Sequence, residues 1–290
     1  MTMNNYIICT DTACDIRAEL LAKWEIPAVS LTFKFDGDET EYNNGDMDVK
    51  TFYDRMKKGG IAKTSSVNME SFRIQFEKHL KEGKDILYLG FSGGLSTTFN
   101  SARLAANDLK DTYPARKLIV IDTLCASAGQ GLIVYLAMKK KAEGATLDEV
   151  AAYANDLLPN IDHWFTVDDL VYLKRGGRVS PAVAFVGNAL GIKPVLHVDN
   201  EGKLISVSKA RGRKSAIGEL AEQYGKLALQ KDSDTVFISH ADCEDDANQL
   251  AEILNTKYGA TVSVITDIGP VIGAHSGPGT LALFFVGKER

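Results

Sequence analysis

The chain has 290 residues and a formal net charge of -5 at pH 7; hydrophobic residues make up 45% of it and charged residues 24%. This length allows two domains with cores of their own, and the composition is ordinary for a globular protein. The acidic balance argues against a nucleic-acid binder that relies on a general basic surface. The four cysteines form no CxxC pair, and neither a secretory signal nor an apolar run of about 18 residues is evident. We therefore expect a cytoplasmic protein with reduced thiols.

The first half of the chain alternates short apolar runs with segments of helical spacing. This alternation predicts a parallel sheet with helices on both faces, which is a three-layer α/β domain. Thr146 and Glu149 have the spacing of a capping box at the start of the last helix. The strands are expected at 6–9, 26–35, 86–91 and 117–121, and the helices at 15–24, 52–58, 69–82, 100–109, 127–141 and 146–158.

Polar segments follow three of the predicted strands. They are Thr10-Asp11-Thr12, the loop from Ser92 to Thr98, and Asp122-Thr123. Because ligands of parallel sheets bind outside the carboxyl ends of the strands, we expect the three segments to converge on one edge. The central loop contains two adjacent glycines and places Ser96 where an N-cap hydroxyl would stand, which is typical of an anion site at a helix N-terminus. An ordinary capped strand-to-helix turn is the alternative interpretation.

The second half of the chain has a different pattern. A hairpin followed by separated strands and helices predicts an α/β domain with a mixed or antiparallel sheet. We therefore expect an N-terminal domain over 1–160 and a C-terminal domain over 161–290. The stretch from Gly269 to Gly279 is rich in Gly and Pro and predicts a rigid irregular loop that holds His275, or a tight connection with a surface histidine. The strands are expected at 194–198, 203–207, 235–239, 261–266 and 281–286, and the helices at 181–190, 214–227 and 245–258.

Neutral hydrogen-bond donors are the candidate functional groups. Thr64 and Ser65 lie in a hydroxyl-rich turn, and with Ser96 and His275 they suit an anion such as a carboxylate that is held without bond breaking. No metal-ligand spacing, dinucleotide fingerprint or Walker loop is evident, so neither a metal nor a cofactor is expected. A serine-dependent hydrolase that uses Ser96 and His275, with an aspartate, is the alternative function. The absence of a Gly-x-Ser-x-Gly motif counts against it.

Seven segments together resemble the DegV family of bacterial fatty-acid-binding proteins. No single segment is decisive, but their order and spacing make the resemblance specific, and it covers essentially the whole chain. The segments are Thr10-Asp11-Thr12, Thr64-Ser65-Ser66, 94–102, Asp122-Thr123, 173–179, 191–194 and 269–279.

The resemblance implies two α/β domains that clasp one long-chain fatty acid, with the acyl tail in an apolar tunnel and the carboxylate between the domains. It implies a carrier that catalyses nothing itself and presents the carboxylate to a fatty acid kinase. The implied carboxylate ligands are Thr64, with Ser65 nearby, Ser96 and His275. Arg178, and less directly Arg211, are implied for the surface that meets the kinase or transiently a membrane.

The chain departs from the family pattern at two places. The family usually has Thr-Ser-x-Pro-Ser, where this chain has Val67 and Asn68 at the last two positions, and it has Thr97 where a glycine normally follows the loop serine. We expect the first departure to loosen the turn that carries Thr64 and the second to add a hydroxyl beside the head group. The segment 181–190, with Phe185, is expected to line the tunnel.

Overall fold

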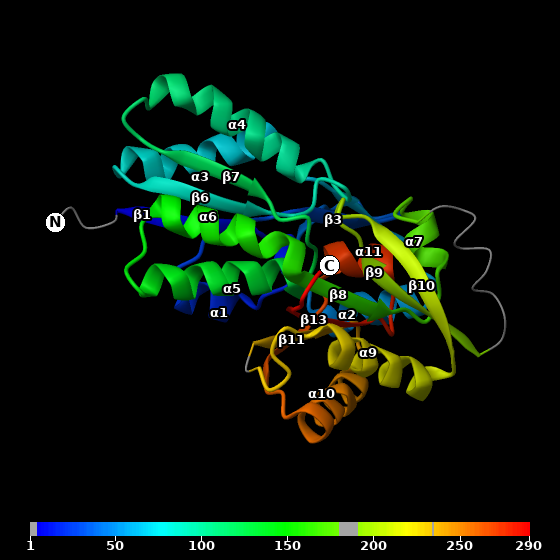
Figure 1. The fold of residues 1–290 in the computed structure, drawn as a ribbon. Coiled ribbons are helices and arrows are strands. Elements are labelled where there is room, and N and C mark those ends of the chain that lie inside the picture. Colours follow the sequence, from blue (N-terminus) through cyan, green and yellow to red (C-terminus); the bar gives the residue numbers. More distant parts are fainter. Residues whose placement is uncertain (1–4, 180–190, 234) are drawn as a thin grey trace.

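The structure, a computed structural model, describes residues 5–179, 191–233 and 235–290. In these ranges the chain forms a parallel sheet in its N-terminal part, a mixed sheet in its C-terminal part and a small antiparallel sheet (Figure 1). The predicted α/β class, with its parallel and mixed sheets, is therefore confirmed. The helix predicted at 181–190, with Phe185, lies outside the described residues.

The N-terminal part is a three-layer α/β arrangement. Its elements are β1 (Tyr6–Asp11), β2 (Ala28–Val29), β6 (Asp85–Gly90), β7 (Leu118–Asp122), α1 (Ala18–Lys23), α3 (Met69–Lys81), α4 (Thr98–Thr112), α5 (Ala128–Ala142) and α6 (Leu147–Leu157), with short 3-10 turns at Thr12–Cys14 and Leu158–Asn160. All four strands are parallel, in the order β2-β1-β6-β7. Alternate residues of β1 face opposite layers: Ile7 packs with α3 and α4, and Ile8 packs with α1, α5 and α6.

Local caps fix the starts of two helices. Thr146 and Glu149 form both bonds of the predicted capping box at the start of α6. Asn68 caps α3, because its side chain accepts a hydrogen bond from the Ser71 amide at 2.9 Å. The departure at Asn68 therefore supplies a helix cap, and its neighbour Val67 is buried in the core.

The C-terminal part is a six-stranded sheet with helices on one face. Its elements are α7 (Val171–Arg175), β8 (Ile161–Thr166), β9 (Ile192–Val198), β10 (Leu204–Arg211), α9 (Arg213–Leu227), β11 (Val236–His240), α10 (Glu244–Tyr258), β12 (Val262–Asp267) and β13 (Leu281–Val286). The strand order is β10-β9-β8-β13-β11-β12, and only the β11–β12 pair is parallel. Helices α9 and α10 pack on one face of the sheet through an apolar cluster.

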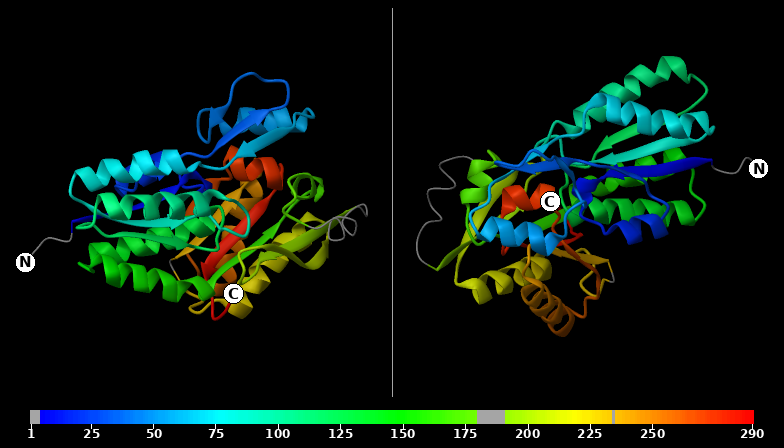
Figure 2. Two further views of the ribbon diagram at one scale, coloured as in Figure 1. Left: turned by 90° about the horizontal axis from the view of Figure 1, so that it is seen from above. Right: turned by 180° about the vertical axis from the view of Figure 1, so that it is seen from behind.

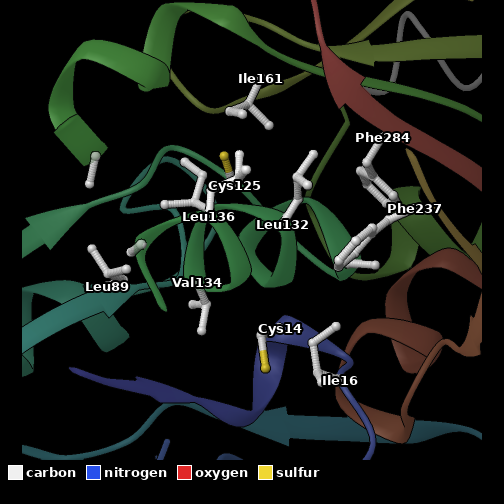
Figure 3. Close-up of a cluster of buried hydrophobic side chains, with 14 of the residues drawn as sticks. Cys14, Ile16, Leu89, Cys125, Leu132, Val134, Leu136, Ile161, Phe237 and Phe284 are labelled. Atoms are coloured by element: carbon white, nitrogen blue, oxygen red, sulfur yellow. The ribbon is translucent and has the colours of Figure 1, made fainter. Parts of the chain in front are cut away.

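Helix α5 is buried between the two large sheets. Figure 3 shows Leu132 and Leu136 of α5 among Leu89 of the N-terminal sheet and Phe237 and Phe284 of the C-terminal sheet. Such a helix is apolar nearly all round because every face meets a core. The two parts therefore share one hydrophobic cluster, and the boundary after residue 160 stays a prediction.

The small antiparallel sheet was not expected from the sequence. It comprises β3 (Thr32–Phe35), β4 (Tyr42–Asn43) and β5 (Ala62–Ser65), in the order β4-β3-β5, and packs on α2 (Val49–Lys57) and α11 (Pro270–Ser276). Figure 2 shows α2, in blue, beside α11, in red. The single strand predicted at 26–35 is wrong, because β2 pairs with β1 whereas β3 pairs with β5. Thr64 and Ser65 likewise lie in a strand rather than in a turn.

The irregular loop predicted over 269–279 is also wrong, because α11 occupies most of it. Pro270 stands in the first turn of this helix, and Gly277 ends it with a φ of 83°. Proline in the first turn and glycine just past the end are residues commonly found at helix termini. No helix in the described ranges has the length and hydropathy that a membrane crossing requires.

Candidate functional site

A cavity of about 450 Å³ lies where the three sheets meet. This volume falls in the range of about 300–1,000 Å³ that is usual for small-molecule sites. Thr64, Ser96, Arg178 and His275 all contribute to its wall. Most of the remaining wall is apolar and includes Leu31, Phe91, Leu95, Phe165, Leu173 and Val198.

Thr64 and His275 form a hydrogen-bonded pair in this wall. Thr64 lies on β5 and His275 on α11, and Oγ1 of the former is 2.8 Å from Nε2 of the latter. Burial, and to a lesser extent the positive charge of Arg178, lowers the pKa of His275 to about 4. The imidazole is therefore neutral at pH 7. Its Nδ1 has no hydrogen-bond partner among the described residues and lies against Gly176, where a Cβ would overlap it.

The position of the single imidazole proton decides what Thr64 can do. A proton on Nδ1 would be a buried donor without a partner, which is costly. On Nε2 the proton is donated to Thr64 Oγ1 instead, so this tautomer is favoured. The hydroxyl of Thr64 then accepts from His275 and keeps its own proton for a ligand in the cavity.

The hydroxyl of Ser96, like that of Thr64, is hydrogen-bonded to groups of the protein. Its Oγ accepts a hydrogen bond from the Thr98 amide at 3.2 Å and lies 3.0 Å from Thr98 Oγ1, which itself accepts from the Val67 amide at 3.3 Å. Among the described residues, Ser96 Oγ is the acceptor within reach of the buried Thr98 hydroxyl, so we infer that Thr98 donates to it. The proton of Ser96 is then left for a ligand. The predicted N-cap role of Ser96 needs correction, because the N-cap of α4 is Thr97, which makes no side-chain cap bond.

Two aspartates hold the loop that carries Ser96. Asp11 accepts from the Phe91 amide at 3.0 Å and from the Tyr88 hydroxyl at 2.6 Å, and Asp122 accepts from the Gly93 amide at 3.1 Å. A Cβ at Gly93 would lie 2.5 Å from the Asp122 carboxylate, so the loop requires glycine there. The predicted convergence of the three strand ends is confirmed.

The remaining predicted residues differ in their surroundings. Ser65 lines the cavity, but its hydroxyl donates to Glu41 at 2.9 Å.

The two arginines predicted for a partner or membrane surface lie in different places. The side chain of Arg178 points inward, and its Nε and Nη2 donate to the Leu95 carbonyl at 3.1 and 2.9 Å. Arg211 is exposed at the end of β10, and its role stays a prediction. Thr97, the second departure from the family pattern, donates to Ser66 at 2.8 Å on the rim of the cavity.

The serine–histidine–aspartate arrangement does not form. His275 bonds Thr64 rather than Ser96, and no carboxylate accepts from its Nδ1 within the described ranges. Asp11 and Asp122 bind the backbone of the Ser96 loop instead. The described part of the chain also holds no group of three or more side chains that could ligate a metal ion. The geometry fits an anion receptor better than a nucleophile with its base.

Comparison with known proteins decides the family. A family model described as "Uncharacterised protein, DegV family" matches residues 6–288. The chain belongs to the DegV family. A DegV domain-containing protein of Clostridium perfringens is 39% identical over 289 residues, which is 99% of each chain. A protein of Thermotoga maritima named fatty acid-binding protein is 33% identical over 288 residues, 98% of each chain.

Solved DegV structures share the fold. A DegV lipid binding protein of Thermotoga maritima superimposes with a TM-score of 0.87 at 30% identity and covers 99% of both chains. A structure titled fatty acid binding of a DegV family protein, from Thermus thermophilus, has a TM-score of 0.87 at 29% identity and covers 97% of this chain and 98% of its own.

Sequence reasoning missed two residues that shape the site of this DegV protein. Gly176 lies against His275, and the Gly-Gly pair at this position was the available signal. Glu41 accepts a hydrogen bond from Ser65, but its acidic surroundings are typical of a solvated loop, and only the sheet register brings it beside Ser65.

Proposed function

We propose that this protein binds one long-chain fatty acid, with the carboxylate at Thr64 and Ser96 and the acyl chain along the apolar wall of the cavity. One observation carries the proposal. The hydroxyls of Thr64 and Ser96 line one cavity, each is bonded to a protein group that can donate to it, and the rest of the wall is mainly apolar. The names of the Thermotoga and Thermus relatives support the same class of ligand.

The energetics agree with this division of roles. Each buried methylene contributes about 0.8 kcal/mol, so ten of them contribute about 8 kcal/mol, which corresponds to a dissociation constant near 1 μM. The acyl tail therefore supplies the affinity, and the polar groups replace the hydrogen bonds to water that the carboxylate loses on binding. The guanidinium of Arg178 adds a positive charge to the same wall. His275 acts through Thr64, as a positioning residue.

The protein would serve as a carrier that presents the carboxylate to a fatty acid kinase. Ser66 and Thr97 are exposed at the rim of the cavity, so a partner can approach the head group there. Exposed cations on α7 and β10, Lys174, Lys209 and Arg211, would face an anionic partner or a membrane surface. On this proposal the domains 1–160 and 161–290 supply opposite walls of the tunnel.

Lipid extraction tests the proposal. Protein purified from a bacterial host is denatured, its lipids are identified by mass spectrometry, and delipidated protein is titrated with palmitate. We expect about one long-chain acid per chain, and binding at least tenfold weaker in Thr64→Val and in Ser96→Ala. Ser101→Ala, in the helix α4 that follows the Ser96 loop and outside the cavity wall, is the control and should bind like wild type. An empty protein that also fails to bind palmitate would refute the proposal.

A further inference from the structure

Two side chains that do not line the cavity, Asp15 and Asn44, hold the N-terminal end of α11. Asp15 accepts a hydrogen bond from the Gly269 amide at 3.0 Å. Asn44 accepts one from the Val271 amide, also at 3.0 Å. Pro270, between these two amides, has no N–H group. The first free N–H groups of the helix are therefore bonded to two segments far away in the sequence.

Both of these side chains are fixed by further contacts. Oδ2 of Asp15 lies 2.6 Å from the hydroxyl of Ser127, and Asn44 donates to the Thr12 carbonyl at 2.8 Å. A Cβ on Gly269 would lie 2.9 Å from Asp15 and 3.1 Å from Asn44, so this glycine fits closely between the two side chains. Asp15 and Asn44 together form a clamp at the start of α11.

Helix α11 depends on such contacts because it is short. It has seven residues, with a proline in its first turn and a glycine in its interior. Isolated helices shorter than about 12–15 residues are marginal in water, so tertiary contacts set the position and rotation of this one. His275 stands one turn beyond Val271, about 6 Å along the axis at a rise of about 1.5 Å per residue. A movement at the clamp is therefore transmitted to the imidazole.

The imidazole has little room for such a movement. It lies between Gly176 and Thr64, and its Nε2 is 2.8 Å from the Thr64 hydroxyl. Hydrogen bonds of this kind span about 2.7–3.2 Å, so a displacement of about 1 Å breaks this one. Thr64 would then no longer be oriented to donate to a carboxylate.

We infer that Asp15 and Asn44 are positioning residues of the carboxylate site, which act through α11 and His275 on Thr64. This inference rests on the proposed function and extends it to two residues that do not touch the ligand. Most of the apolar wall belongs to other elements, so the clamp acts on the head group and leaves the binding of the acyl tail unchanged.

Alanine variants of the clamp test the inference with two ligands. Delipidated wild type, Asp15→Ala and Asn44→Ala are titrated with palmitate and with hexadecanol, which has a tail of the same length but no carboxylate. We expect each variant to bind palmitate about tenfold more weakly, as for a lost hydrogen bond to a charged group, and hexadecanol within about twofold of wild type. An equal loss for both ligands would overturn the inference, because the clamp would then support the whole cavity.

Asn43→Ala is the matched control. Asn43 is exposed next to Asn44, and its side chain bonds Asp46 rather than α11. This variant should bind both ligands like wild type. Asn44 is only half-buried, so Asn44→Ala carries the test if Asp15→Ala does not fold.

Two further variants separate positioning from a general loss of structure. Asp15→Asn keeps an oxygen for the Gly269 amide, so it should restore palmitate binding to within about threefold of wild type. In the Thr64→Val background, Asn44→Ala should weaken palmitate binding less than about twofold further, because the clamp acts through the missing hydroxyl. A further loss of about tenfold in that background would overturn the inference.

The imidazole itself gives a readout without any ligand. Nitrogen-15 NMR, with the His275 signals assigned from His275→Gln, should show a neutral ring protonated at Nε2 in wild type and a mixture of tautomers in Asn44→Ala. An unchanged spectrum in Asn44→Ala would overturn the role of the clamp alone. A wild-type protein that binds no palmitate would overturn the proposed function, so the two failures are distinguishable.

Discussion

Replacing Gly176 by alanine should displace His275 and weaken carboxylate binding. A Cβ at this position would lie 3.0 Å from Cε1 and 3.1 Å from Cγ of the imidazole, and closer still to Nδ1. Ordinary contacts are about 3.5–4.0 Å, so the ring must retreat by roughly 1.5 Å at Nδ1. Retreat is blocked on the other side, because Nε2 is already 2.8 Å from Thr64 Oγ1. The ring must therefore rotate, and its bond to Thr64 is lost.

Without that bond, Thr64 is no longer oriented toward the ligand. A hydrogen bond to a charged group contributes about 1.5–3 kcal/mol, so we expect palmitate to bind about 10- to 100-fold more weakly in Gly176→Ala. The φ of Gly176 is -72°, which alanine adopts freely, so the effect is steric. Isothermal titration of delipidated protein measures it.

The matched control is Gly218→Ala in α9. A Cβ there meets open space, and alanine in a helix interior is favourable by about 0.5–1 kcal/mol. This variant should bind as wild type and be slightly more stable. Wild-type affinity in Gly176→Ala would refute the view that His275 acts by orienting Thr64.

Three further predictions concern stability. The pKa of His275 is about 4 in the folded protein and about 6.5 in the unfolded chain. Its contribution to the free energy of unfolding is therefore complete above pH 6.5 and is lost as the pH falls toward 4. Urea unfolding of His275→Gln should show a flatter pH profile in that window. Burial raises the pKa of Asp15 to about 8. Its contribution to the free energy of unfolding is therefore present below about pH 4 and is lost as the pH rises to 8. In thermal unfolding at pH 9, Asp15→Asn should be more stable than wild type, and parallel curves of stability against pH for the two proteins would contradict this. Gly94→Ala would place a Cβ 2.6 Å from the Glu201 carbonyl and should cost about 1–3 kcal/mol in urea unfolding, against no loss in Gly218→Ala.

The parallel sheet could be predicted because its signals are local. Each strand is a short apolar run, and its polar carboxyl end falls at one edge whatever the remainder of the chain does. The Ser96 loop and the convergence of Asp11 and Asp122 followed from that rule.

The small sheet could not be predicted, because its pairing depends on contacts distant in sequence. The apolar run at 26–35 is continuous, and only the pairing of Phe33 with Thr64 shows that it contains two strands. Helix α11 is not predicted because the glycine in its interior, Gly273, is unfavourable for a helix in isolation. The fold requires this glycine, since it lies against the Tyr53 hydroxyl, which a side chain would displace. Glu41 had no signal of its own.

The most direct test of the account is a crystal structure of the complex with palmitate. We expect the carboxylate oxygens within about 3.2 Å of both Thr64 Oγ1 and Ser96 Oγ, with His275 still bonded to Thr64 and the acyl chain inside the cavity. A carboxylate bound away from both hydroxyls, or an acyl chain outside this cavity, would contradict the account.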